Sequence, residues 1–123
     1  MGLIKAGLGA LGGVLADKNI QVSIHAPYFI SMSSLEEEKR LNSVNYILQS
    51  ATALDAMGGR RVIFHSGSCA KLTRQEALAK AMDTMGLMMQ AIDDNGIMGC
   101  FADGGIARWI FQLQLHRFPS LAC

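Results

Sequence analysis

The chain has 123 residues and a formal net charge of +1, and half of its residues are apolar. This length limits it to one ordinary domain, and the near-zero charge excludes a global electrostatic attraction to nucleic acid or acidic membranes. Three cysteines without C-x-x-C spacing argue against a disulfide framework, and no run of roughly 20 apolar residues is present to span a bilayer. We therefore expect a cytoplasmic protein with reduced thiols and no membrane contact.

The first part of the chain carries only a weak pattern, and we expect residues 1–19 to be poorly defined. One helix would fit there, although its glycines lower helix propensity. A strand is predicted at residues 20–25, where Ile20, Val22 and Ile24 alternate with polar residues. Pro27 prevents the hydrogen-bond ladder from continuing.

A long helix is predicted next. Ser34-Leu35-Glu36-Glu37 has the composition of a capping box, in which a hydroxyl and a glutamate each accept a hydrogen bond from a backbone N–H. Gly58-Gly59 predicts the end of this helix. Between them, apolar residues at helical spacing form one face: Leu41, Val44, Ile47, Leu48, Ala51 and Leu54.

The same plan then repeats. An apolar strand is predicted at residues 61–65, a turn at 66–68, and a second capping box at Thr73-Arg74-Gln75-Glu76. Asn95-Gly96 predicts the end of the second helix. The core face of this helix consists of Leu78, Ala81, Met82, Met85, Met89 and Ile92.

Two successive strand–loop–helix units predict an α/β fold with parallel strands. Their spacing of about 40 residues is typical of a (β/α)8 TIM barrel, which needs roughly 250 residues. We therefore predict part of such a barrel, with two βα units in residues 20–96 and a third strand beginning near residues 97–102. The atypical segment 97–123 is interpreted as the end of a truncated chain, which a reading-frame change could have made non-homologous.

His25 and His65 are the candidate metal ligands, because each closes a predicted strand. Neighbouring parallel strands lie about 4.8 Å apart, and their carboxyl ends meet at the edge where barrels place their chemistry. Two imidazoles there could share one Zn²⁺ at Zn–N distances of about 2.0–2.1 Å. The alternative is a pair of core or hydrogen-bonded histidines. No catalytic residue is assigned.

Three motifs together resemble the endonuclease IV family of apurinic/apyrimidinic endonucleases over about residues 18–95. They are His25-Ala26-Pro27-Tyr28, Asn42-Ser43 in the following helix, and Phe64-His65-Ser66-Gly67-Ser68. The resemblance implies a zinc-dependent enzyme that hydrolyses DNA 5′ to abasic sites.

Specific roles follow from that resemblance. His25 and His65 would bind the first zinc of a trinuclear cluster, and Tyr28 would contact DNA at the abasic site. Ordinary loop packing is an equally good interpretation of Tyr28. Abasic DNA is thus the implied partner and Zn²⁺ the implied cofactor.

Two departures from the family pattern matter. Ser66 stands where the family has proline, so we expect a looser loop. Glu76 is the last glutamate, so the family's zinc-bridging glutamate has no counterpart. We interpret Asp103 as a turn residue and do not expect His116 to be a ligand. The chain is therefore expected to hold at most a partial metal site and to be incomplete for catalysis.

Other functions remain open. A sugar isomerase or epimerase of the xylose isomerase-like group would share the architecture, although its early strands are richer in carboxylate ligands. A non-catalytic α/β remnant with two structural histidines is the third interpretation. Uncovered apolar faces of a partial barrel also predict self-association. A basic cluster could contact phosphate near the metal edge or simply face solvent: Arg60, Arg61, Lys71 and Arg74.

Overall fold

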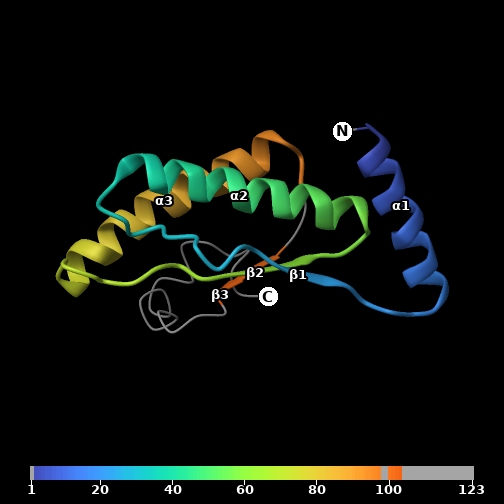
Figure 1. Cartoon of the computed structure of the whole chain (residues 1–123), viewed down its shortest axis with the longest axis horizontal. Coiled ribbons are helices and arrows are strands. Elements are labelled where there is room, and N and C mark those ends of the chain that lie inside the picture. The colour runs from blue at the N-terminus through green and yellow to red at the C-terminus, as the bar shows by residue number, and fades with distance from the viewer. Residues whose placement is uncertain (1, 98–99, 104–123) are drawn as a thin grey trace.

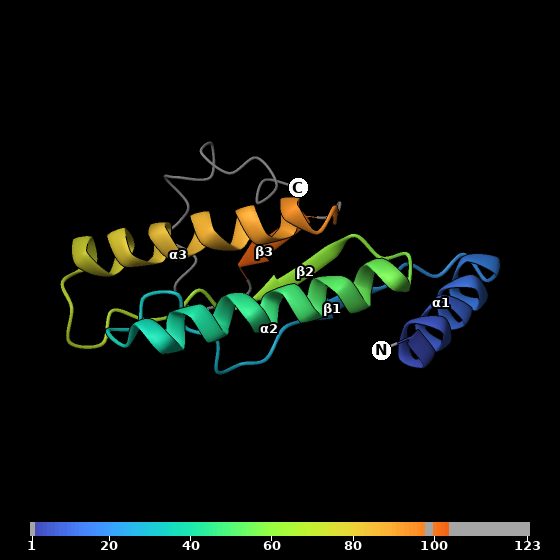
Figure 2. The same ribbon diagram turned by 90° about the horizontal axis from the view of Figure 1, so that it is seen from above.

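The computed structural model describes residues 2–97 and 100–103, which form three helices and a three-stranded parallel sheet. The order is α1 (Gly2–Asp17), β1 (Ser23–His25), α2 (Glu37–Ala56), β2 (Arg61–Phe64), α3 (Arg74–Asp94) and β3 (Cys100–Asp103). Helices α2 and α3 lie side by side over one face of the sheet, and α1 lies beyond the end of α2 (Figures 1 and 2). The predicted α/β class with parallel strands is confirmed.

The strand order is β1-β2-β3, so chain order and spatial order agree. In the register, Ile24 pairs with Val62 and His25 with Ile63, while Phe64 pairs with Asp103. Each crossover carries a helix back over the same face, as in βαβ units of an α/β barrel.

The hydrophobic core lies between the sheet and the two covering helices. Val62 and Phe64 are fully buried against the helices, because side chains two residues apart share one face of a strand. Loop residues complete this core: Ala26, Ile30 and Met32 are all buried. The loop after β1 is therefore part of the packed interior.

Both long helices end as their glycines predict. After α2, Gly58 has φ +77°, Gly59 N–H donates to Leu54 O at 3.0 Å, and Gly58 N–H donates to Asp55 O at 3.0 Å. This is a Schellman motif, in which glycine takes the left-handed position. Gly96 and Ile97 close α3 with the same pair of bonds.

The two predicted capping boxes have different outcomes. At α3, Glu76 N–H donates to Thr73 Oγ1 at 3.2 Å and Thr73 N–H donates to Glu76 Oε2 at 2.8 Å, so this box is confirmed. At α2 the prediction is wrong. The helix begins at Glu37, its N-cap Glu36 makes no side-chain cap bond, and Ser34 Oγ accepts from Glu36 N–H instead.

Two other boundaries are corrected. The first strand begins at Ser23 and not at residue 20, because Ile20 N–H donates to Leu15 O in the turn that ends α1. On α2 the core face is rotated slightly: Leu41 is 44% exposed, whereas Ser43 is buried. The polar Ser43 is buried because it binds the neighbouring loop, as described below.

Helix α1 contacts the C-terminal end of α2 and contributes no buried residue. A Cβ on Gly12 would lie 2.4 Å from Met57 O, so glycine allows this helix to approach the end of α2. Leu3, Ile4, Leu11 and Val14 are all exposed on α1. Among the described residues, none of the helices is long and apolar enough to cross a membrane.

Candidate functional site at the carboxyl edge of the sheet

The two predicted ligand residues lie next to each other. His25 ends β1, and His65 directly follows β2, two positions beyond the strand partner of His25. Residues 63 and 65 point to the same face of the sheet, so both imidazoles lie on the face that the helices leave open. Their ring centroids are 4.9 Å apart and their planes are inclined by 51°.

The geometry fits a shared cation. Two imidazoles on one tetrahedral Zn²⁺, at Zn–N of about 2.0–2.1 Å, have ring centres roughly 5 Å apart. His25 Nδ1 lies 2.6 Å from Ala26 O, and a carbonyl oxygen can only accept, so the proton is on Nδ1. Nε2 of His25 then carries the free lone pair, which is the usual arrangement of a ligand histidine.

The two loops after the strands are bonded to each other. Met32 N–H donates to Ser66 O at 3.0 Å, and Ser33 Oγ donates to Ser68 O at 2.7 Å. We call these two bonds the loop clamp. Since Ser66 directly follows His65, the clamp fixes the second histidine relative to the loop that begins at His25.

Helix side chains support the same loop from below. Ser31 N–H donates to Ser43 Oγ on α2 at 3.0 Å, and Thr84 Oγ1 on α3 donates to Met32 O at 2.7 Å. Ser43 and Thr84 are both buried. Neither of these contacts was predicted from the sequence. The signal that could have indicated them is a hydroxyl residue at the edge of an apolar helix face.

The loop after β2 is buried and bonded at position 66. Ser66 is 1% exposed, and its carbonyl oxygen accepts the Met32 bond, which any residue type could do. Gly67 has φ +116°, and a Cβ there would lie 2.7 Å from Ser33 Oγ. These contacts restrain the loop, and the looser loop expected from serine in place of proline stays a prediction.

An exposed aromatic cluster is formed by the loop that follows His25 and by α2. Tyr28 is 83% exposed and meets Phe29 edge-on at a centroid distance of 5.7 Å. Phe29 in turn meets Tyr46 of α2 at 5.0 Å, again edge-on. We call Tyr28, Phe29 and Tyr46 the aromatic cluster. The sequence pointed only to Tyr28, although Phe29 adjoins it and Tyr46 lies off the core face of its helix.

Asp103 occupies a strand end and not a turn. It is the last residue of β3 and pairs with Phe64, one residue before His65. The earlier interpretation as a turn residue is thus corrected, and the backbone at Asp103 lies at the same edge of the sheet as His65. His116 lies outside the described residues. Within the described part of the chain, no group of three or more potential metal ligands is gathered.

The basic cluster is divided between the two ends of the sheet. Arg60 precedes β2 and Arg61 begins it, so both lie at the amino edge, whereas Lys71 and Arg74 follow the strand on the carboxyl side. Four residues of strand separate Arg61 from His65 by about 13 Å. Arg60 and Arg61 therefore start at the end of the strand away from the histidine pair.

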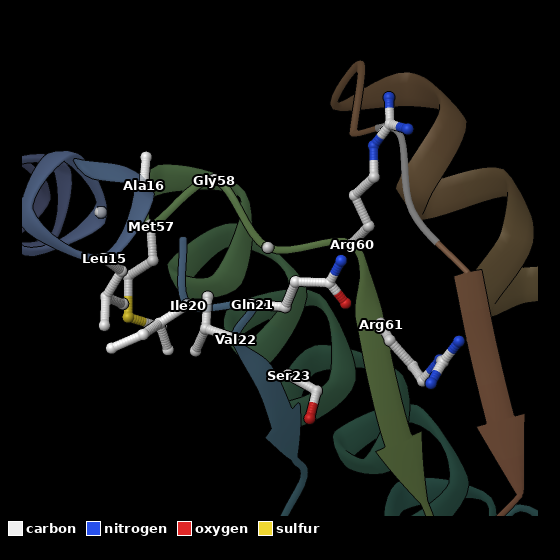
Figure 3. A pocket seen from close by; sticks show the side chains of 12 residues that line it. Leu15, Ala16, Ile20, Gln21, Val22, Ser23, Met57, Gly58, Arg60 and Arg61 are labelled. Carbon is white, nitrogen blue, oxygen red and sulfur yellow. The ribbon is translucent and has the colours of Figure 1, made fainter. Parts of the chain in front are cut away.

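These two arginines line a pocket at the amino edge, between α1 and the strands. Figure 3 shows Leu15, Ile20 and Met57 grouped on one side of this pocket and Arg60 and Arg61 on the other. In the part of the chain that the structure describes, neither arginine forms an ion pair. The pocket is at the opposite end of the strands from the histidines, so it is separate from the candidate site.

Parallel strands under covering helices define a segment of an α/β barrel, and the histidines lie at the carboxyl edge, where such barrels place their active sites. Comparison with known protein families leads to the same architecture. The family model for xylose isomerase-like TIM barrels matches residues 2–101. The chain therefore belongs to the xylose isomerase-like TIM barrel family.

Known relatives are longer than this chain. An uncharacterised protein from Methanocaldococcus jannaschii is 34% identical over 58 residues, which cover 47% of this chain and 21% of that protein. A D-tagatose 3-epimerase-like protein superposes with a TM-score of 0.62 at 18% identity, covering 77% of this chain and 37% of its own.

Two further solved structures give similar values. The 3-keto-D-glucoside 4-epimerase YcjR from E. coli has a TM-score of 0.60 at 14% identity, over 81% of this chain and 42% of its own. SacUVDE has a TM-score of 0.58 at 17% identity, over 93% of this chain and 50% of its own. At such identities the likeness concerns the fold, and the chain spans half or less of each structure.

Proposed function

We propose that this chain carries part of a zinc-dependent endonuclease that acts on abasic DNA, in which His25 and His65 bind one zinc ion and Tyr28 contacts the nucleic acid. The observation that carries the proposal is the histidine pair, with ring centroids 4.9 Å apart at the carboxyl edge. The match of residues 2–101 to the xylose isomerase-like TIM barrel family supports the barrel architecture that the proposal requires.

Each part of the chain has a defined task in this proposal. When bound, the zinc would act as a Lewis acid on a phosphate oxygen. His25 presents Nε2 because its Nδ1–H is held by Ala26 O, and the loop clamp keeps His65 beside it. The exposed ring of Tyr28 offers a face on which a base or sugar can pack.

Metal binding is the first test. Zinc content per chain and competition with a cobalt(II) probe are measured for the wild type, His25→Ala and His65→Ala. Loss of one of two imidazoles is expected to weaken binding at least tenfold, and His116→Ala is the matched control that should change nothing. Equal zinc content in the wild type and in a His25→Ala/His65→Ala double variant would contradict the proposal.

DNA is the second test. We expect a zinc-loaded chain to bind a duplex with one abasic site more tightly than an intact duplex, and Tyr28→Ala to remove most of that preference. Stacking on an aromatic side chain contributes about 1–3 kcal/mol per base, which corresponds to roughly 5- to 150-fold in affinity. Cleavage by this chain should be weak or absent, because two imidazoles hold metal poorly.

A sugar isomerase or epimerase is the competing function, since two of the structural neighbours carry epimerase names. It is distinguished by incubating the metal-loaded chain with ketoses and following epimerisation. Sugar conversion that depends on His25, with no preference for abasic DNA, would replace the endonuclease proposal. Strong, EDTA-sensitive nicking would show instead that the chain is sufficient for catalysis.

A further inference from the structure

Thr84 lies in the middle of α3, yet its hydroxyl reaches the loop that starts at the first histidine. The residue is 1% exposed, and Oγ1 lies 2.7 Å from Met32 O, which is 52 residues away in the chain. It also lies 2.9 Å from Lys80 O in its own helix. A hydroxyl has a single hydrogen, so the shorter contact makes Met32 O the main acceptor.

Met32 connects this hydroxyl to the second histidine. Its side chain is completely buried, its carbonyl accepts from Thr84, and its N–H donates to Ser66 O, next to His65. A continuous path of two hydrogen bonds therefore joins α3 to the residue after His65. Ser33, the neighbour of Met32, adds the other bond of the loop clamp.

The chain contains a natural comparison for this arrangement. Thr52 on α2 donates to Leu48 O at 2.8 Å, the same bond to the fourth preceding residue that Thr84 makes to Lys80 O. Such a local bond satisfies the hydroxyl but connects nothing beyond the helix. Thr84 differs because its hydroxyl also meets a buried carbonyl of the loop that carries the clamp.

We propose that Thr84 is a positioning residue: through Met32 it holds the loop after β1 against the loop after β2 and so sets the separation of the His25 and His65 rings. The metal-affinity part of this inference rests on the proposed zinc site, whereas the ring geometry does not. Partners that orient metal ligands from outside typically contribute about 10- to 100-fold in affinity.

The experiment uses Thr84→Val, which keeps the shape and removes the hydroxyl, with Thr52→Val as matched control and Thr84→Ser as the conservative variant. In metal-free protein, NMR measures the ring-to-ring nuclear Overhauser effect between His25 and His65 and the amide exchange of Met32. Thr84→Val is expected to lose the ring-to-ring Overhauser effect and the slow exchange of the Met32 amide. Thr52→Val and Thr84→Ser should keep both the Overhauser effect and the slow exchange.

Cobalt(II) titration with visible absorption follows on the same proteins. Thr84→Val should bind about tenfold or more weakly with an altered spectrum, and Thr84→Ser should restore the wild-type values. If Thr84→Val does not fold, Ser33→Ala removes the Ser33–Ser68 bond of the loop clamp and should shift the same readouts in the same direction.

The outcomes separate the two proposals. Unchanged ring contacts and cobalt affinity in folded Thr84→Val, with only a lower melting temperature, would make Thr84 a purely structural residue and overturn the inference. Lost ring contacts in Thr84→Val together with no cobalt binding by any protein, wild type included, would leave the positioning role standing and refute the zinc site.

Discussion

The charge of one glutamate contributes to the start of α3. Glu76 accepts hydrogen bonds from the backbone N–H and from the hydroxyl of Thr73. Both bonds lower the pKa of the Glu76 carboxyl below its ordinary value of 4.5, and the backbone bond has the larger effect. Both bonds favour the ionised form. The capping box thus has a pH dependence of its own, although the side chain is exposed.

Stability should reflect this pKa. Because the folded-state value is depressed, the stabilising contribution is complete above the unfolded-state pKa and is lost as pH falls through the folded-state pKa. We expect Glu76→Gln to lower the urea midpoint of unfolding at neutral pH. The difference between the midpoints of the variant and the wild type should shrink as pH falls from about 5 to about 2, a range that brackets the carboxyl titration. A midpoint difference that stays the same at every pH in that range would contradict this prediction.

At the scale of elements, α1 depends on a close approach and not on buried apolar area. Glycine at position 12 meets the backbone of Met57, whereas Gly13 has open space around the position of a Cβ. The two neighbouring glycines therefore make opposite predictions for the same substitution.

Gly13→Ala should stabilise α1 by about 0.5–1 kcal/mol, because alanine is the better helix former. Gly12→Ala should cost about 1–3 kcal/mol through steric overlap, or release α1 from α2. Amide exchange along residues 8–15 measures both effects. Equal changes in the two variants would mean that α1 does not pack as described.

The sequence predicted elements well where the signal was local. Helix ends at Gly58 and Gly96 and the capping box at Thr73 were correct, because backbone geometry at these residues depends on their immediate neighbours. The box at Ser34 failed, since the preceding loop is already bonded to α2 and to the loop after β2, as by Ser31 N–H to Ser43 Oγ. Propensity cannot reveal a contact between distant segments.

The candidate site divides in the same way. The proximity of His25 and His65 followed from two parallel strands of equal plan, and the structure brings the rings together. The loop clamp, Thr84 and the aromatic cluster were not foreseen, because each joins residues from different elements. Asp103 was misplaced because nothing local separates a short strand end from a turn.

At the scale of the molecule, residues 2–97 and 100–103 form a sheet with α2 and α3 over one of its faces. In the described part of the chain, β1 and β3 each pair only with β2, so both outer edges carry unpaired backbone groups. The face opposite α2 and α3 bears the exposed residues Ser23, His25 and Arg61. A complete (β/α)8 barrel pairs further βα units with both edges of such a sheet.

Self-association should follow from the apolar residues on α1. Leu11 and Val14 lie three positions apart, share one helix face and are 47% and 50% exposed. We expect the sedimentation-average mass to rise with concentration. Leu11→Lys/Val14→Lys should weaken association roughly 10- to 160-fold, since each half-exposed side chain can still bury about half of the roughly 1.5–3 kcal/mol that full burial contributes.

Leu87→Lys on α3 is the control, because Leu87 is similarly exposed at 52% but belongs to another helix. A monomer at every concentration, or equal weakening by the α1 and α3 variants, would argue against α1 as the contact surface.

Gly67 sets a limit on how this protein can be altered. Its backbone conformation is unfavourable for side chains, and the space above its Cα is occupied by Ser33 Oγ. Libraries that randomise the segment after the second histidine should therefore recover functional clones with diversity at the exposed Ser68 and invariance two residues beyond His65. A designer who wishes to graft a new specificity onto this rim can vary the exposed Ser68 but has to keep the glycine before it.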